Sequence, residues 1–119
     1  MSRAAVAVSG DQEWPVARIS GEIDLTNVDD LAATLRNAVG NRSHGLVLDL
    51  SDVEYLDSTG LRLLFRLLRE LNDRQQQLRV VVPESAVIYG VLILGGVGSA
   101  VPMFPTIQNA TAPGTGNHP

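Results

Sequence analysis

The chain has 119 residues, no cysteine and a formal net charge of −4. Nine basic residues against thirteen acidic ones argue against a nucleic-acid-binding surface, and the lack of cysteine excludes disulfides, zinc–thiolate sites and a thiol nucleophile. Hydrophobic residues make up 45% of the sequence, which favours one folded domain over a disordered chain. The N-terminus has no apolar run long enough for a signal peptide, so we expect a cytoplasmic protein.

The N-terminal part of the chain predicts a β-hairpin followed by a helix. Residues 4–8 and 14–20 have the apolar, β-branched content of strands and flank a short turn. Thr26 or Asn27 can then cap a helix, which ends at Gly40. The buried face of this helix is predicted to comprise Val28, Leu31, Leu35, Ala38 and Val39.

The alternation of strand and helix continues along the chain. Residues 46–50 predict a buried strand, and apolar residues at helical spacing predict a helix over residues 60–72. Residues 78–82 predict another strand, residues 84–94 a helix, and residues 100–104 a last strand. This order predicts a single α/β domain, in which helices pack on a mixed sheet of four to five strands with parallel crossovers after the hairpin.

The composition changes after Pro105. Pro, Gly, Thr and Asn are frequent from there to the C-terminus, which is typical of a disordered tail. We therefore place the domain at residues 1–105 and the tail at residues 106–119. The tail offers few apolar groups to a core, so we expect its removal to change stability little.

An uncharged stretch covers residues 86–104 and has nearly the length of a membrane span. Glycines and a proline interrupt it, so we interpret it as a helix, a glycine turn and a strand, without a membrane span. A helix over residues 88–94 cannot bury all of its large apolar side chains on one face. Those that stay exposed predict a contact surface for a partner or for a homodimer. The side chains concerned are Ile88, Val91, Leu92, Ile93 and Leu94.

Residues 57–60 place a carboxylate, two hydroxyls and a glycine between a predicted strand and a predicted helix. Free backbone N–H groups and the positive end of the helix dipole stabilise an anion at such a position. Asp57 or Ser58 can simply cap the helix, which contributes about 1 kcal/mol. Ser58 can also accept a phosphate, whose charge would change any docking surface around it. The two roles are compatible.

The helix predicted over residues 60–72 has a wider apolar arc than a helix lying on a sheet needs, because Leu63 and Leu67 extend it. Either the helix is deeply packed with a solvated polar side, or Leu63 or Leu67 borders a partner site. The charged residues on the remaining side are Arg62, Arg66, Arg69, Glu70 and Asp73.

Three enzyme-like patterns fit poorly. Residues 57–60 approach the Asp-Thr-Gly or Asp-Ser-Gly of aspartic proteases, but one residue is inserted and a helix follows at once. Residues 96–98 lack the third glycine and the preceding strand of a dinucleotide-binding turn. His44 and His118 have no neighbours at catalytic or metal-ligand spacing. We therefore predict no enzyme activity, no catalytic residue, no cofactor and no metal.

Several short stretches, in their order along the chain, carry a resemblance to a known family. They are Gly21-Glu22-Ile23-Asp24, Leu48-Asp49-Leu50-Ser51, Tyr55-Leu56-Asp57-Ser58-Thr59-Gly60-Leu61, and Leu94-Gly95-Gly96-Val97 with Met103-Phe104-Pro105. Together they resemble a STAS domain of the bacterial anti-sigma-factor antagonist type. The Asp-Ser-Thr-Gly-Leu turn is the most specific of them.

The resemblance implies partner switching in the control of transcription. Such proteins bind an anti-sigma factor that is also a serine kinase, and so release a sigma factor. The kinase then phosphorylates the serine of the turn and the antagonist dissociates, until a serine phosphatase restores it. By residue match that serine is Ser58. Thr59 stands where the family often has a second serine and is a secondary acceptor at most. The implied partner-binding residues are Asp24, Asp57, Ser58, Thr59, Gly60, Arg62, Leu63, Arg66 and Leu67.

Two features depart from this family pattern. Asp52 and Glu54 stand where small or apolar residues are commoner, and they add negative charge near Ser58. The helix predicted before Gly95 lacks the basic residues that relatives often show. A second function therefore stays open, that of a non-switching STAS interaction subunit in a stress-signalling or transporter-associated complex.

Overall fold

The computed structural model describes residues 3–111 and contains one five-stranded sheet with the strand order β1-β2-β3-β4-β5. β1 and β2 form the predicted antiparallel hairpin, and β2 to β5 run parallel. The mixed α/β fold predicted from the sequence is therefore confirmed. The strands are β1 (Ala4–Gly10), β2 (Pro15–Ile23), β3 (Gly45–Leu56), β4 (Gln77–Val81) and β5 (Met103–Phe104).

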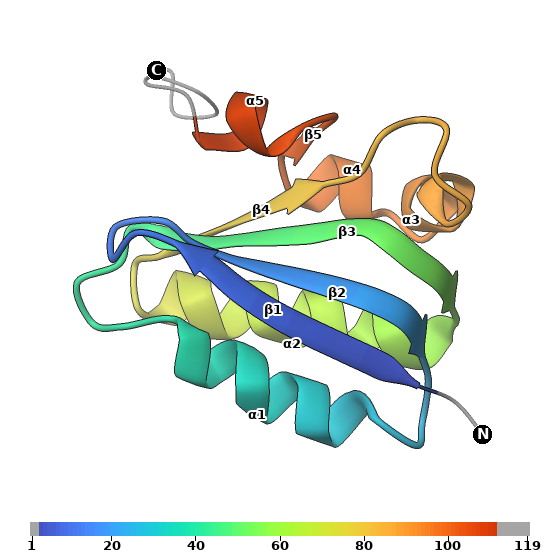
Figure 1. Ribbon diagram of the computed structural model, residues 1–119, viewed down its shortest axis with the longest axis horizontal. Helices are drawn as coiled ribbons and strands as arrows, with labels where there is room; N and C mark the ends of the chain where they lie inside the picture. The colour runs from blue at the N-terminus through green and yellow to red at the C-terminus, as the bar shows by residue number, and fades with distance from the viewer. Residues whose placement is uncertain (1–2, 112–119) are drawn as a thin grey trace.

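The helices cover both faces of the sheet (Figure 1). α1 (Val28–Ala38) and α2 (Ser58–Asp73) lie side by side on one face. α5 (Ile107–Thr111) packs on β3, β4 and β5 from the other face. Two short helices, α3 (Tyr89–Leu94) and α4 (Val97–Ala100), connect β4 to β5.

The main core lies between the sheet and the helix pair α1 and α2. Leu63 and Leu67 are each only 2% exposed, because α2 is wedged between the sheet, α1 and α4. The wide apolar arc of α2 therefore reflects deep packing, the first of the two interpretations above. Other large, fully buried members of this core are Ile19, Ile23, Leu35, Leu46, Leu48, Leu50, Leu64 and Leu92.

Three predicted boundaries differ clearly from the observed ones. The last strand was predicted over residues 100–104 but covers only Met103–Phe104, because residues 97–100 form α4. β3 continues to Leu56 instead of ending at Leu50, because its second half still pairs with β2 through Ile23. The helix predicted from Glu84 begins only at Tyr89, after a turn. In the described part of the uncharged stretch, and elsewhere in residues 3–111, no helix has the length and hydropathy to cross a membrane.

The fold also extends beyond Pro105, where a disordered tail was predicted. Residues 107–111 form α5, and Ala110 is fully buried. The Arg79 guanidinium lies 3.8 Å from the centre of the Trp14 ring and donates a 2.7 Å hydrogen bond to the Ala110 carbonyl. Ala110 closes a small second core with Val16, Val47 and Val81. The prediction for residues 112–119, including His118, lies outside the described residues.

Candidate functional site

The sheet brings Asp24 and Asp57 to the same edge. β2 and β3 run parallel, and Ile23 is paired with Leu56 at their carboxyl ends. The next residue of each strand is an aspartate, so Asp24 and Asp57, which are far apart in sequence, follow neighbouring strands at the same edge of the sheet. This register builds the acidic edge next to Ser58.

Asp57 is the N-cap of α2. Its carboxylate accepts hydrogen bonds from the backbone N–H groups of Thr59 at 2.9 Å and Gly60 at 3.4 Å. These groups have no partner within the helix, so the side chain stabilises the first turn. The predicted capping role therefore belongs to Asp57, which leaves the Ser58 hydroxyl free for other chemistry.

Replacing Asp57 with alanine should lower the free energy of unfolding by about 1 kcal/mol, because two backbone N–H groups lose their acceptor. The variant Asp57→Asn keeps an acceptor oxygen at the cap and should retain most of that stability. Urea denaturation followed by circular dichroism measures both differences. Equal losses in the two variants would show that the charge of Asp57, and not its capping bond, stabilises the helix.

Ser58 is the first residue of α2, and its side chain is exposed. Within residues 3–111, no side chain or backbone group forms a hydrogen bond with its hydroxyl. The neighbouring Thr59 is half-buried and lines a groove between α1 and α2. Of the two hydroxyls in the turn, Ser58 is therefore the more accessible to another protein.

Gly60 is buried where α2 begins against the ends of the strands. A Cβ at this position would lie 2.7 Å from Cγ of Leu56 and 3.3 Å from Cγ2 of Ile23. A side chain there would force the start of the helix away from β2 and β3. Glycine thus lets the helix N-terminus, and Ser58 with it, sit directly at the edge of the sheet.

The surroundings of Ser58 include an aromatic side chain, Tyr55, that was not among the predicted site residues. Tyr55 is exposed, and its hydroxyl donates a 3.3 Å hydrogen bond to the Asp57 carboxylate. The charge of Asp57 and this hydrogen bond raise the pKa of the Tyr55 hydroxyl, and Asp24 and Glu22 add smaller effects of the same sign. Strict alternation along β3 would place Tyr55 on the same face as the buried Val53, but the register of β2 and β3 shifts here, so no local pattern indicated this exposed position.

Asp52 contributes less to this acidic edge than its sequence position suggested. The Arg18 guanidinium lies 3.4 Å from the Asp52 carboxylate and 3.2 Å from that of the buried Asp49. One arginine thus offsets charge on both aspartates in the middle of the sheet. Glu54 is exposed, as the prediction of added negative charge requires.

The predicted partner residues of α2 divide into exposed and buried side chains. Arg62 and Arg66 are exposed, whereas Leu63 and Leu67 are buried and form the floor beneath them. A groove of about 250 Å³ runs between the starts of α1 and α2, with Leu63 at its base. The leucines therefore position the charged side chains and offer little surface of their own.

A second exposed surface lies on and before α3. Ile88 and Leu92 are buried, whereas Val87, Ile93 and Leu94 are 78%, 45% and 92% exposed. The expectation that this helix cannot bury its apolar residues on one face is confirmed. The patch adjoins α2, because the Leu61 side chain packs directly over Gly95, the residue after α3.

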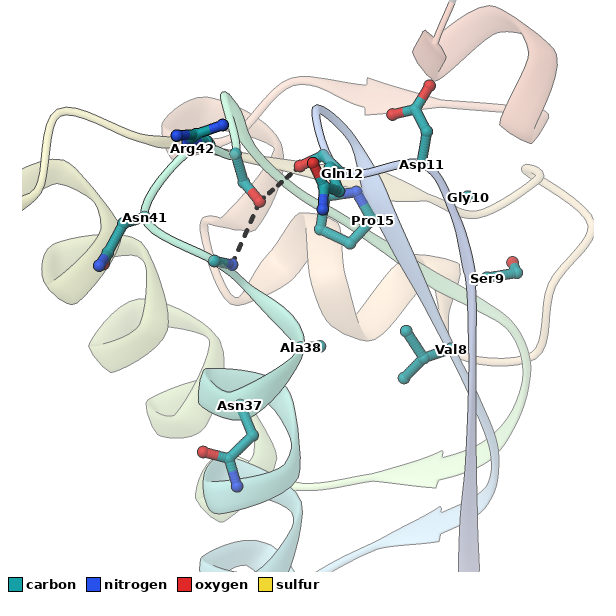
Figure 2. Close-up of a pocket in the computed structure, with 12 residues that line it drawn as sticks. Val8, Ser9, Gly10, Asp11, Gln12, Pro15, Asn37, Ala38, Asn41 and Arg42 are labelled. Atoms are coloured by element: carbon teal, nitrogen blue, oxygen red, sulfur yellow. Dashed lines mark hydrogen bonds between the residues drawn. The ribbon is translucent and has the colours of Figure 1, made fainter.

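A cavity of about 580 Å³ lies at the opposite end of β3 from Ser58, between the β1–β2 turn and the loop after α1 (Figure 2). Ser43 ties these two segments together by donating to the Gln12 carbonyl and accepting from the Gly40 N–H. The charged residues that line the cavity are Asp11 and Arg42, one acidic and one basic. Within residues 3–111, there is no cluster of three or more His, Asp or Glu side chains that could bind a metal ion.

Comparisons with known proteins place this geometry in a family. The family model of the STAS domain matches residues 5–110. The anti-sigma-F factor antagonist RsfB of Mycobacterium tuberculosis is 30% identical over 105 residues, which cover 88% of this chain and 84% of that protein. The crystal structure of an anti-sigma factor antagonist from Mycobacterium paratuberculosis is 29% identical, with a TM-score of 0.79 over 91% of each chain. The Bacillus cell fate determinant SpoIIAA, solved in its phosphorylated form and 22% identical, shares the fold with a TM-score of 0.64 over 89% of this chain and 96% of that one. The chain belongs to the STAS domain family.

Proposed function

We propose that this protein is an anti-sigma-factor antagonist that binds an anti-sigma factor with serine kinase activity and is released when Ser58 is phosphorylated. The single observation that carries the proposal is the free, exposed hydroxyl of Ser58 at the start of α2, beside a cap supplied by Asp57. The names of the relatives, which are anti-sigma-factor antagonists, support the same function. The protein then acts in the cytoplasm as a binding module, without catalysis of its own.

The chemistry at Ser58 is a phosphoryl transfer carried out by the partner. The kinase moves the γ-phosphoryl group of ATP to Oγ of Ser58, which loses its proton, and ADP leaves. A serine phosphatase restores the hydroxyl by adding water and releasing inorganic phosphate. The phosphate carries about −1.5 to −2 charges at neutral pH and is tolerated at a helix N-terminus, so the domain needs no refolding to accept it.

The proposed contact surface surrounds Ser58. Asp24, Thr59, Arg62 and Arg66 offer polar groups at its rim, while the cap and the buried Gly60, Leu63 and Leu67 hold the first turns of α2 in place. The apolar patch of α3 extends this surface through Leu61. A contact that combines a polar turn with an adjacent apolar patch is typical of protein–protein recognition.

Calorimetric titration of the unmodified protein into each purified anti-sigma factor of the source organism tests this function. We expect one of these proteins to bind in the micromolar range or tighter, which corresponds to at least about 8 kcal/mol. The same titration with the apolar patch altered by Leu94→Ser should give weaker binding, because that side chain is almost fully exposed. Absence of binding to every anti-sigma factor would contradict the proposal.

A further inference from the structure

Ser58 lies at the head of a line of arginines on α2. Arg62, Arg66 and Arg69 follow it at steps of four, four and three residues, which places all four side chains along one side of the helix. All three arginines are exposed, and they line the groove of about 250 Å³ between α2 and the start of α1. We refer to Arg62, Arg66 and Arg69 as the arginine stripe.

The arginine stripe lacks the close carboxylate partners that other arginines of this protein have. Arg36 pairs with Glu70 at 2.8 Å, and Arg18 pairs with Asp49 at 3.2 Å. No stripe residue forms an ion pair within 4 Å in the described part of the chain, although Glu70, whose pKa is lowered mainly by its hydrogen bond with Arg36, is also influenced by the charges of Arg66 and Arg69. The groove lining includes a single acidic side chain, that of Asp29, so positive charge is in excess there.

We propose that the arginine stripe binds an acidic segment of the anti-sigma partner, and that a phosphate on Ser58 competes with this segment by pairing with Arg62. The inference rests on the proposed function for the partner and for the phosphate. Charge complementarity selects the occupant, because guanidinium groups bind carboxylates in paired hydrogen bonds. A protein of net charge −4 would otherwise repel an acidic surface.

Competition follows from the spacing of Ser58 and Arg62. An acidic group four residues before an arginine lies one helical turn away on the same side, where the two attract each other. The phosphate carries more charge than a carboxylate and has three acceptor oxygens. When the phosphate pairs with Arg62, this arginine is no longer available to the acidic segment of the partner. The phosphate also places negative charge at the Ser58 end of the groove, where it repels that segment.

The first experiment measures binding of the anti-sigma factor to the triple variant Arg62→Gln, Arg66→Gln, Arg69→Gln by calorimetry. We expect the affinity to fall about thirtyfold. The affinity should also depend less on salt concentration, because the variant lacks the charge attraction that salt screens in the wild type. The matched control is Arg3→Gln, Arg42→Gln, Arg74→Gln, which has the same net charge and alters exposed arginines outside the stripe. It should bind within about twofold of wild type.

The second experiment needs no partner. Phosphoserine is incorporated at position 58 during translation, and the phosphate is titrated by ³¹P nuclear magnetic resonance. Pairing with Arg62 should make the phosphate lose its second proton at lower pH than in the variant Arg62→Gln. The control Arg69→Gln alters an arginine about 16 Å from Ser58 along the helix axis and should titrate like wild type.

Either of two results would overturn the inference: equal binding by the stripe variant and its control, or equal titration of the phosphate with and without Arg62. A wild-type protein that binds no anti-sigma factor would instead contradict the proposed function. The phosphate titration would still decide whether Arg62 pairs with Ser58 phosphate in that case, so the two failures are distinguishable.

Discussion

A chain that ends at Pro105 should unfold at a clearly lower temperature than the full-length protein. Truncation removes α5 and uncovers the valines of the second core, with which the fully buried Ala110 packs. Loss of this apolar burial should cost about 2–4 kcal/mol, which corresponds to a fall in Tm of about 10 °C or more. Differential scanning calorimetry measures the change directly.

The truncation also affects Arg79, in two opposite ways. In the intact protein it is 3% exposed, and burial lowers the pKa of its guanidinium below the ordinary value. Truncation removes its hydrogen-bond acceptor on Ala110 but also lets water reach the charge. These two changes oppose each other, so we expect the apolar loss to dominate.

A chain that ends at Thr111 is the control for the truncation, since it retains every described contact of α5. It should melt close to the full-length protein. In the intact chain, Ile107→Ala should reproduce part of the loss, because Ile107 packs against the second core. Identical melting of the chains that end at 105 and at 111 would show that α5 contributes nothing to stability.

Ser58→Asp should bind the anti-sigma factor at least about a hundredfold more weakly than wild type. The added charge lies at a surface where Asp24 and Asp57 are already close, and it occupies the centre of the proposed contact. A cost of about 3 kcal/mol at the interface is sufficient for this effect. Calorimetric titration of the two proteins gives the ratio of their dissociation constants.

The variant should nevertheless fold normally. A carboxylate in the first turn of α2 is stabilised by the helix dipole by about 0.3–1 kcal/mol, so Tm should be unchanged or slightly higher. Ser9→Asp adds the same charge to an exposed serine near the opposite end of the sheet and should bind like wild type. Equal affinity of Ser58→Asp and wild type would leave Ser58 with a structural role only.

Local patterns predicted the elements of the main core well. Alternating strand and helix signals indicated the mixed sheet. The apolar arc of α2 left deep packing and a partner contact both open, and the burial of Leu63 and Leu67 decides for deep packing. The end of the fold was missed, because α5 is short and its burial depends on Trp14 and Arg79, which are distant in sequence. Composition near Pro105 carries no information about such contacts.

The site was predictable only in part, because some of its features are local in sequence and others depend on the tertiary fold. The turn at Ser58 is a local motif, so its position at the start of a helix could be read directly from the chain. The contact of Tyr55 with Asp57 and the ion pair of Arg18 with Asp52 depend on strand register and side-chain direction. These are tertiary properties that no local pattern specifies.

Phosphorylation by the proposed anti-sigma kinase shows whether Ser58 is the residue that controls binding. The purified protein is incubated with the kinase and ATP, and its intact mass and modified peptide are determined by mass spectrometry. We predict the addition of one phosphate on Ser58 and no addition to Ser58→Ala, which should still bind the kinase. Equal phosphorylation of Ser58→Ala, or phosphorylated wild type that binds the kinase as tightly as the unmodified protein, would show that Ser58 does not control binding.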